Sequence, residues 1–153
     1  MIWYNGNMQA GFDYVGITTI FYCHDGNGNF LLQKRSSKTR DEQGRWECGA
    51  GQLEFGLSPQ ENVLKKVEEE FGCKGEIDEE LPPRSMIREH EGKKTHWIGF
   101  PFVVKVNRDE VKNNEPDKID EIGWFKFGQF PEPLHSALAE SVKDRSHVFE
   151  KYS

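Results

Sequence analysis

Long apolar runs are missing from this sequence of 153 residues. No stretch approaches the ~18 consecutive apolar residues that a membrane-spanning helix needs. Residues 1–12 also lack the basic and apolar regions of a secretory signal. We therefore expect no membrane partner and a cytoplasmic location.

Basic clusters are scarce as well. The 20 lysines and arginines are outnumbered by 26 aspartates and glutamates, which leaves a formal net charge of -6. Binding to a large nucleic-acid surface depends on neutralising many phosphates, so this balance argues against such a partner. A small anionic molecule is not excluded, because a local basic pocket or a bridging cation can hold it.

Cysteine is also rare. Cys23, Cys48 and Cys73 lie far apart and form no C-x-x-C pair, so they predict neither a disulfide framework nor a zinc ribbon. We expect three free thiols in a reducing compartment.

The sequence does contain a series of strand patterns. β-branched and aromatic residues between turn residues predict strands at 14–23, 30–36, within 46–56, on both sides of a turn at 91–94, and at 119–127. Pro101 has no N–H to donate, so we expect its strand to be an edge strand or to carry a bulge there. We expect 76–85, which contains two prolines, to be a loop and 134–149 to be a carboxy-terminal helix.

The strongest local pattern is a helix between Ser58 and Gly72. Ser58 and Glu61 form an S-x-x-E capping box, Pro59 suits the first turn, and Gly72 suits the left-handed residue that ends a helix. Strands come first, then this helix, then further strands and a last helix. That order predicts one α+β domain over 1–153, with helices packed on a mixed sheet.

Two interpretations of the acids at the end of this helix stay open. Glu69 and Glu70 follow Lys65 and Lys66 by four residues, and such pairs on a solvated helix face contribute ~0.3 kcal/mol each. Alternatively, the two acids and a nearby glycine-rich turn supply oxygen ligands to Mg²⁺ or Mn²⁺. Magnesium bridges readily to phosphate oxygens, so the second interpretation indicates a phosphate-containing substrate.

The stretch 49–73 resembles the Nudix box, whose pattern is G-x5-E-x7-R-E-U-x-E-E-x-G-U with U an aliphatic residue. The opening glycine, the aliphatic position, the paired acids and the closing glycine match Gly51, Val67, Glu69, Glu70 and Gly72. The strand patterns at 30–36 and 117–125 also resemble those that flank the box. The resemblance covers 14–138.

This resemblance implies an α/β/α sandwich around a mixed sheet. It implies a divalent-metal-dependent hydrolase that cleaves a pyrophosphate linkage in a nucleoside diphosphate derivative, by attack of water on phosphorus. Glu69 and Glu70 would be catalytic and would hold Mg²⁺ or Mn²⁺. The implied metal ligands are Gly51, Glu54, Glu69, Glu70 and Glu121, with Glu115 a weaker candidate, and the substrate-binding residues are Arg35 and Lys66.

Three positions depart from the box. Leu57 and Lys65 replace the glutamate and arginine that are thought to brace the loop against the helix in the family. Losing both partners together leaves no stranded charge. Lys66 replaces a carboxylate that family members use on the metal, and an ammonium has only donors.

The departure at Lys66 leaves alternatives open. Glu54, Glu121 or another loop acid supplies the missing oxygen, or Lys66 contacts a substrate phosphate directly. In the second class of function, the chain has lost catalysis and is a Nudix-fold module that binds a nucleotide or a protein partner. A homodimer is compatible with the sequence, which does not set the oligomeric state.

Overall fold

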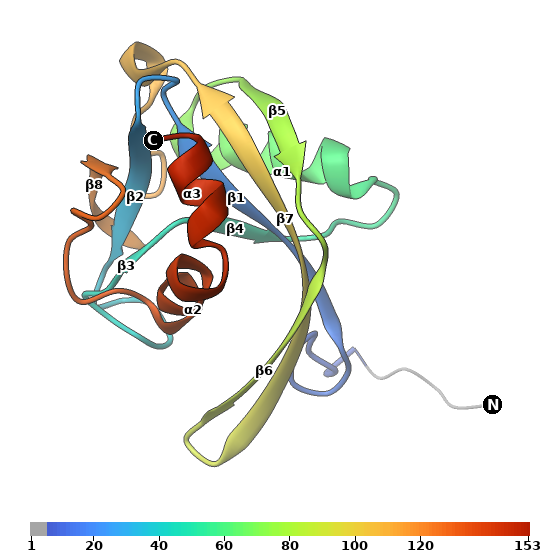
Figure 1. Cartoon of the computed structure of the whole chain (residues 1–153). Helices are drawn as coiled ribbons and strands as arrows, with labels where there is room; N and C mark the ends of the chain where they lie inside the picture. The colour runs from blue at the N-terminus through green and yellow to red at the C-terminus, as the bar shows by residue number, and fades with distance from the viewer. Residues whose placement is uncertain (1–5) are drawn as a thin grey trace.

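A mixed β-sheet forms the centre of the molecule. In the computed structural model, which describes residues 6–153, eight strands form this sheet (Figure 1). They are β1 (Gly16–His24), β2 (Asn29–Arg35), β3 (Trp46–Glu47), β4 (Gly49–Gln52), β5 (Gly75–Glu80), β6 (Arg84–His90), β7 (Lys93–Val106) and β8 (Ile119–Lys126). The helices are α1 (Pro59–Phe71), α2 (Ser136–Asp144) and α3 (Ser146–Lys151), with a single 3₁₀ turn, η1 (Arg108–Glu110).

The strand pairings make the sheet mixed. β1 runs parallel to β7 and antiparallel to β4 and β2. β7 carries β6 and β5 along its other edge, and β2 pairs with both β3 and β8. β1 meets β2 at the single pair His24 and Phe30, whereas β4 pairs with the earlier half of β1. The sheet therefore opens between β4 and β2, next to the glycine-rich segment of the box.

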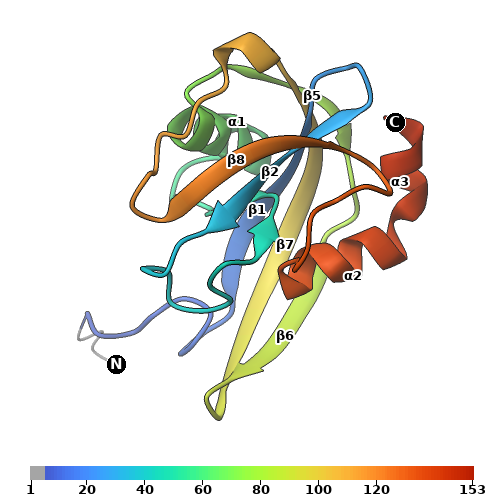
Figure 2. The ribbon, with the colours of Figure 1, turned by 90° about the vertical axis from the view of Figure 1, so that its left-hand side faces the viewer.

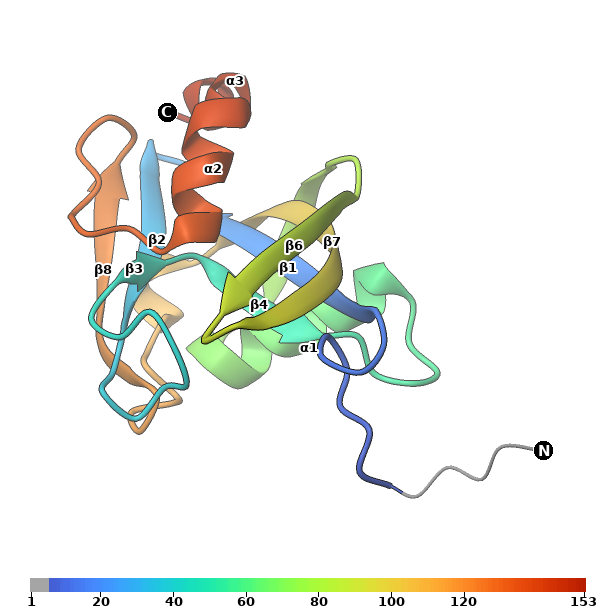
Figure 3. The same cartoon turned by 90° about the horizontal axis from the view of Figure 1, so that it is seen from below.

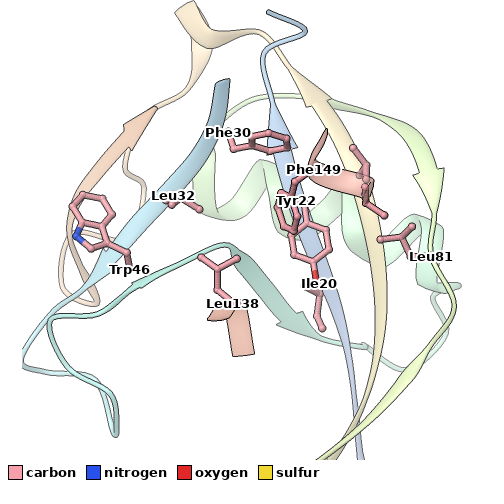
Figure 4. Close-up of a cluster of buried hydrophobic side chains, with 10 residues drawn as sticks. Ile20, Tyr22, Phe30, Leu32, Trp46, Leu81, Leu138 and Phe149 are labelled. Atoms are coloured by element: carbon pink, nitrogen blue, oxygen red, sulfur yellow. The ribbon is translucent and has the colours of Figure 1, made fainter. Parts of the chain in front are cut away.

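Helices cover both faces of the sheet, as Figures 2 and 3 show. One buried cluster joins α1 to the sheet through Phe21, Val63, Val67 and Phe71. The other joins α2 and α3 to the opposite face, and Figure 4 shows its side chains, among them Tyr22, Leu138 and Phe149. This arrangement is the predicted α+β sandwich. Within residues 6–153, none of the helices is long and apolar enough to cross a membrane.

The predicted caps of α1 are confirmed. The Ser58 hydroxyl accepts a hydrogen bond from the Glu61 N–H at 3.1 Å and donates to the Glu61 carboxylate at 3.1 Å. Gly72 ends the helix with φ of 66°, a left-handed conformation that favours glycine. The caps fix where α1 begins and ends, and the buried residues Val63, Val67 and Phe71 fix which face of it lies on the sheet.

Replacing the amino-terminal cap tests this local contribution. Ser58→Ala removes the acceptor of the Glu61 N–H, so we expect the free energy of unfolding to fall by about 1 kcal/mol. Urea denaturation followed by circular dichroism measures the change. Ser58→Asp, which keeps an acceptor, is the control and should retain most of the wild-type stability.

The expectation of a loop at 76–85 holds only for 81–83, because β5 extends to Glu80 and β6 begins at Arg84. Residues Gly75–Glu80 form β5, which pairs antiparallel with β7. Ile77 packs against the α1 cluster, while its neighbours Glu76 and Asp78 are exposed. Acidic residues carry little intrinsic strand preference, so the pairing with β7 decides the conformation.

The expectation for Pro101 is also corrected. β7 lies between β1 on one side and β5 and β6 on the other, so it is not an edge strand. The carbonyl of Pro101 accepts from the Leu81 N–H in the connection between β5 and β6. The proline nitrogen faces the same side of the strand as its carbonyl, so it falls where the ladder on β7 is interrupted.

The expected carboxy-terminal helix is divided in two. Arg145 separates α2 from α3 with φ of -125° and ψ of 28°, outside helical values. The break lets Leu138 of α2 and Phe149 of α3 both enter the same buried cluster (Figure 4).

Candidate active site

Two adjoining cavities lie at the box, with volumes of about 680 Å³ and 490 Å³. Both are lined by Arg35, Arg40, Glu47, Ala50 and Gly51, so they meet at the opening between β4 and β2. The larger cavity extends towards β6 and the start of α2, and the smaller extends towards the end of α1. A further cavity of about 700 Å³ lies between the β1–β2 turn and η1 and contains no residue of the box.

Lys66 is the residue whose position differs most from the sequence interpretation. Its Nζ lies 3.0 Å from a carboxylate oxygen of Glu54 and 3.4 Å from one of Glu69. The expected partner Glu70 is not one of these two. The aliphatic stem of Lys66 lies on Gly51, where an added Cβ would stand 2.5 Å from the Lys66 side chain. Gly51 is therefore needed for the close approach of the Lys66 stem to β4.

The electrostatic environment favours the charged form of Lys66. Partial burial lowers its pKa, but hydrogen bonds and charge attraction from Glu54 and Glu69 outweigh burial and hold the pKa above its ordinary value. The hydrogen bonds from Lys65 and Lys66 in turn lower the pKa of Glu54. Glu54, a predicted metal ligand, is thus committed to two ammonium groups.

Lys65 braces the box loop against α1. Its Nζ lies 2.9 Å from Glu54 and 3.8 Å from Glu69. Glu54 therefore provides the ion pair with Lys65 that a glutamate at position 57 would make in the family. The sequence interpretation of Leu57 and Lys65 did not anticipate this pair. The loop remains tied to the helix by charge.

A buried amide supplies a second tie that the sequence analysis missed. Asn62 is fully buried on α1, and its Nδ2 donates to the Thr19 hydroxyl at 2.9 Å and to the Gly51 carbonyl at 3.4 Å. Its Oδ1 accepts from the Glu54 N–H at 3.0 Å. The available signal was an asparagine directly before Val63 on the inward stripe of the helix.

The Gly51 carbonyl, an expected metal ligand, is engaged in the interior. Besides Asn62, the Thr19 hydroxyl donates to it at 3.2 Å. The preceding residue, Ala50, is exposed and lines both cavities.

Glu70 points inwards while Glu69 stays at the surface. Glu70 is only 8% exposed, and it accepts a hydrogen bond of 3.5 Å from Gln33. Burial, with the nearby charges of Glu115 and Glu47, raises the pKa of Glu70 from 4.5 to about 9. Glu70 therefore keeps a proton at neutral pH, although it lines the same cavity as Glu69.

Arg35, expected to bind substrate, is enclosed by two carboxylates. Its guanidinium lies 2.8 Å from Asp41 and 3.1 Å from Glu47, and its Nε donates to the Asp41 carbonyl at 3.0 Å. Burial raises the pKa of Glu47 although the charge of Arg35 lowers it. Arg35 thus fixes the 36–45 loop to β3 while it lines both cavities.

Glu115, not Glu121, comes close to the acids of α1. Glu121 is exposed and lies opposite Lys34 in the β2–β8 pair. The neighbours of Lys34 on β2, Gln33 and Arg35, line the cavity, whereas Lys34 does not. Alternate residues of a strand point to opposite faces, so Glu121 faces away from the cavity. Glu115 lines the cavity and raises the pKa of Glu70.

The larger cavity has an aromatic wall. Trp97 of β7 lines it, and an added Cβ on Gly11 or Gly16 would come within 2.2 Å and 2.5 Å of the indole. Two glycines are therefore required where the amino-terminal segment crosses the ring. Across the cavity, the Arg40 guanidinium lies 4.6 Å from the centre of the Phe12 ring.

The arrangement does not fit a divalent cation at the position of Lys66. Among residues 6–153, no three histidine, cysteine, aspartate or glutamate side chains lie close enough together to hold a metal ion. Glu54 and Glu69 face ammonium groups, and Glu70 is buried beside Gln33. Glu69 and Glu70, expected to share Mg²⁺, engage different partners.

Known proteins share the sequence pattern and the fold described above. The sequence model described as the NUDIX domain matches residues 15–145. The structure of a MutT NUDIX hydrolase from Burkholderia pseudomallei is similar, with 25% identity, a TM-score of 0.73, and coverage of 84% of this chain and 96% of that chain. These matches confirm the family resemblance, the fold class and the hydrolase class predicted from the sequence.

Two further structures share the fold at lower identity. A UDP-X diphosphatase is 19% identical with a TM-score of 0.67, covering 97% of this chain and 66% of that chain. The MutT protein from Methanosarcina mazei Go1 is 24% identical with a TM-score of 0.64, covering 90% and 92%. At these identities the similarity concerns the fold alone.

Proposed function

Because the chain belongs to the NUDIX domain family, we propose that it hydrolyses a pyrophosphate linkage in a nucleoside diphosphate derivative. Nudix hydrolases generally use divalent metal ions. The ammonium of Lys66 cannot be a ligand of the predicted Mg²⁺ or Mn²⁺. The roles proposed below are therefore assigned to side chains of this chain and not to a metal ion.

The observation that carries the proposal is the junction of the two cavities. A nucleoside diphosphate derivative has a flat aromatic base at one end and anionic phosphates at the other. The larger cavity offers the indole of Trp97, on which a base can stack. The smaller cavity offers the ammonium of Lys66 beside the acids Glu69 and Glu70. The shared segment at Ala50 and Gly51 lies where the two parts of such a substrate join.

The two adjacent acids differ in their environment, and this suits proton transfer in both directions. In the proposed reaction, the oxygen of water bonds to phosphorus and the bond from phosphorus to the bridging oxygen breaks. Glu69, at the rim, accepts a proton from the attacking water. Glu70, which carries a proton at neutral pH, donates it to the leaving phosphate oxygen.

A hydrolysis assay tests the proposal. Nucleoside diphosphate and triphosphate derivatives would be incubated with the protein in EDTA, in Mg²⁺ and in Mn²⁺, and the products separated by chromatography. We expect cleavage at the pyrophosphate linkage of at least one derivative. Absence of cleavage under all three conditions would overturn the proposal.

A nucleotide-binding module without catalysis is the second candidate. The observation that favours it is the ammonium of Lys66 in contact with Glu54 and Glu69. In that case a nucleotide should bind in calorimetry while the same panel shows no cleavage.

A further inference from the structure

The ammonium of Lys66 joins three segments of the site. It contacts Glu54 on the loop after β4 and Glu69 on α1, while its stem lies on Gly51 of β4. An ammonium has three N–H donors, and these two carboxylates account for two of them. One donor remains, and the residue lines the 490 Å³ cavity.

Lys65 provides a natural comparison on the same helix. It pairs with the same two acids, Glu54 and Glu69, but its side chain is 47% exposed and lies outside the cavity lining. The Lys66 side chain is only 17% exposed. The two lysines therefore share their ion pairs and differ in access to the cavity.

The other cations at this cavity are exposed or are held by residues away from the paired acids Glu69 and Glu70. Arg35 is enclosed by Asp41 and Glu47. Arg40 pairs with Asp41 at 3.4 Å and lies over Phe12. Lys38 lies 3.6 Å from the exposed Asp117, and Lys118 is itself exposed. Lys66 is the cation that is both enclosed and placed beside the paired acids of the box.

We infer that Lys66 binds the diphosphate of a nucleoside diphosphate derivative directly, through the third N–H of its ammonium. The ammonium of Lys66 then contacts Glu54, Glu69 and a phosphoryl oxygen together, in place of a divalent cation at this position, while Lys65 supplies the second positive charge that balances the two carboxylates. A hydrogen bond between an ammonium and a phosphate is charge-assisted and strong. The inference depends on the proposed function only for the class of ligand.

Binding of α,β-methylene ADP, whose bridge resists hydrolysis, tests the inference without any turnover. Calorimetry would compare wild type, Lys66→Met and Lys65→Met in EDTA at constant ionic strength. We expect wild type to bind in EDTA and Lys66→Met to bind at least about tenfold more weakly. Lys65→Met should stay within about threefold of wild type. Lys66→Arg, which keeps the charge, should recover part of the affinity and shows that the fold tolerates substitution here.

A metal titration gives an independent readout. Lys66→Glu supplies a carboxylate beside Glu54 and Glu69, so we expect it to bind Mn²⁺ at least about tenfold more tightly than wild type, as followed by electron paramagnetic resonance of the ion alone. Analogue binding that needs Mn²⁺ and is unchanged in Lys66→Met would overturn the inference and leave the proposed function standing. An analogue that binds under no condition would overturn the ligand class and the inference together.

Discussion

Glu70→Gln is expected to stabilise the fold at alkaline pH and to reduce hydrolysis by at least about 100-fold. Glutamine has nearly the shape of the protonated acid and can still accept the hydrogen bond from Gln33. It cannot donate the carboxyl proton that the proposed reaction uses. One substitution should therefore raise stability and remove activity.

The pH dependence follows from the raised pKa of Glu70. Its pKa is about 9 in the folded protein and 4.5 ordinarily. Between these values the folded state holds a proton that the unfolded state has released. Stability then falls as the pH rises, by up to about 1.4 kcal/mol per pH unit. Glutamine does not ionise, so the variant should lack this part of the slope.

Urea denaturation between about pH 6 and about pH 9, with hydrolysis measured on the same samples, checks both effects. The matched control is Glu68→Gln, because Glu68 is exposed on the same helix and lies outside the cavity lining. Parallel loss of stability with pH in wild type and Glu70→Gln would contradict the buried, protonated state of Glu70. Full activity in Glu70→Gln would remove it from the proposed proton transfer.

Arg35→Met is expected to lower the free energy of unfolding by about 3–5 kcal/mol at neutral pH. Asp41 and the largely buried Glu47 would then lose the guanidinium that compensates them. Burial already raises the pKa of Glu47, and removing Arg35 would raise it further. An acid with a raised pKa costs stability as the pH rises, so the loss should be smaller in mildly acidic solution than at neutral pH, because protonation of Glu47 removes its uncompensated charge.

Lys34→Met is the matched control, because Lys34 precedes Arg35 on β2 and faces the other side of the sheet. Its effect should stay within about 0.5 kcal/mol. Both variants would be unfolded in urea at the two pH values. A stable Arg35→Met that no longer binds α,β-methylene ADP would restore the sequence interpretation of Arg35 as a substrate ligand and contradict the structural one.

Local features of the site were predictable because short-range chemistry determines them. The capping box at Ser58 and the left-handed Gly72 define α1, and the order of glycines and acids in 49–73 indicates the family. Each of these features depends on residues within a few positions of one another. Their effect on the local structure does not depend on where the helix packs.

Features that depend on pairing between distant segments were not predictable in the same way. β5 is a strand because β7 lies beside it, although its acids favour a loop. The choice of Glu115 over Glu121 depends on which face of β8 meets the cavity, and a bulge between Lys34 and Arg35 changes that register. Lys66 turns to Glu54 and Glu69 because its stem fits against Gly51, a contact that helical spacing alone does not contain.

The indole of Trp97 gives the larger cavity an optical property. The backbone at Gly11 and Gly16 lies against the ring, with no room for a Cβ, and the ring also lines the space proposed for a base. Indole emission depends on the polarity around the ring and is quenched by stacking. Trp124 instead lies beneath Arg108, 5.2 Å from its guanidinium, away from that space. The chain thus carries an intrinsic fluorophore at the point where a ligand would enter, and no label is needed to follow its arrival.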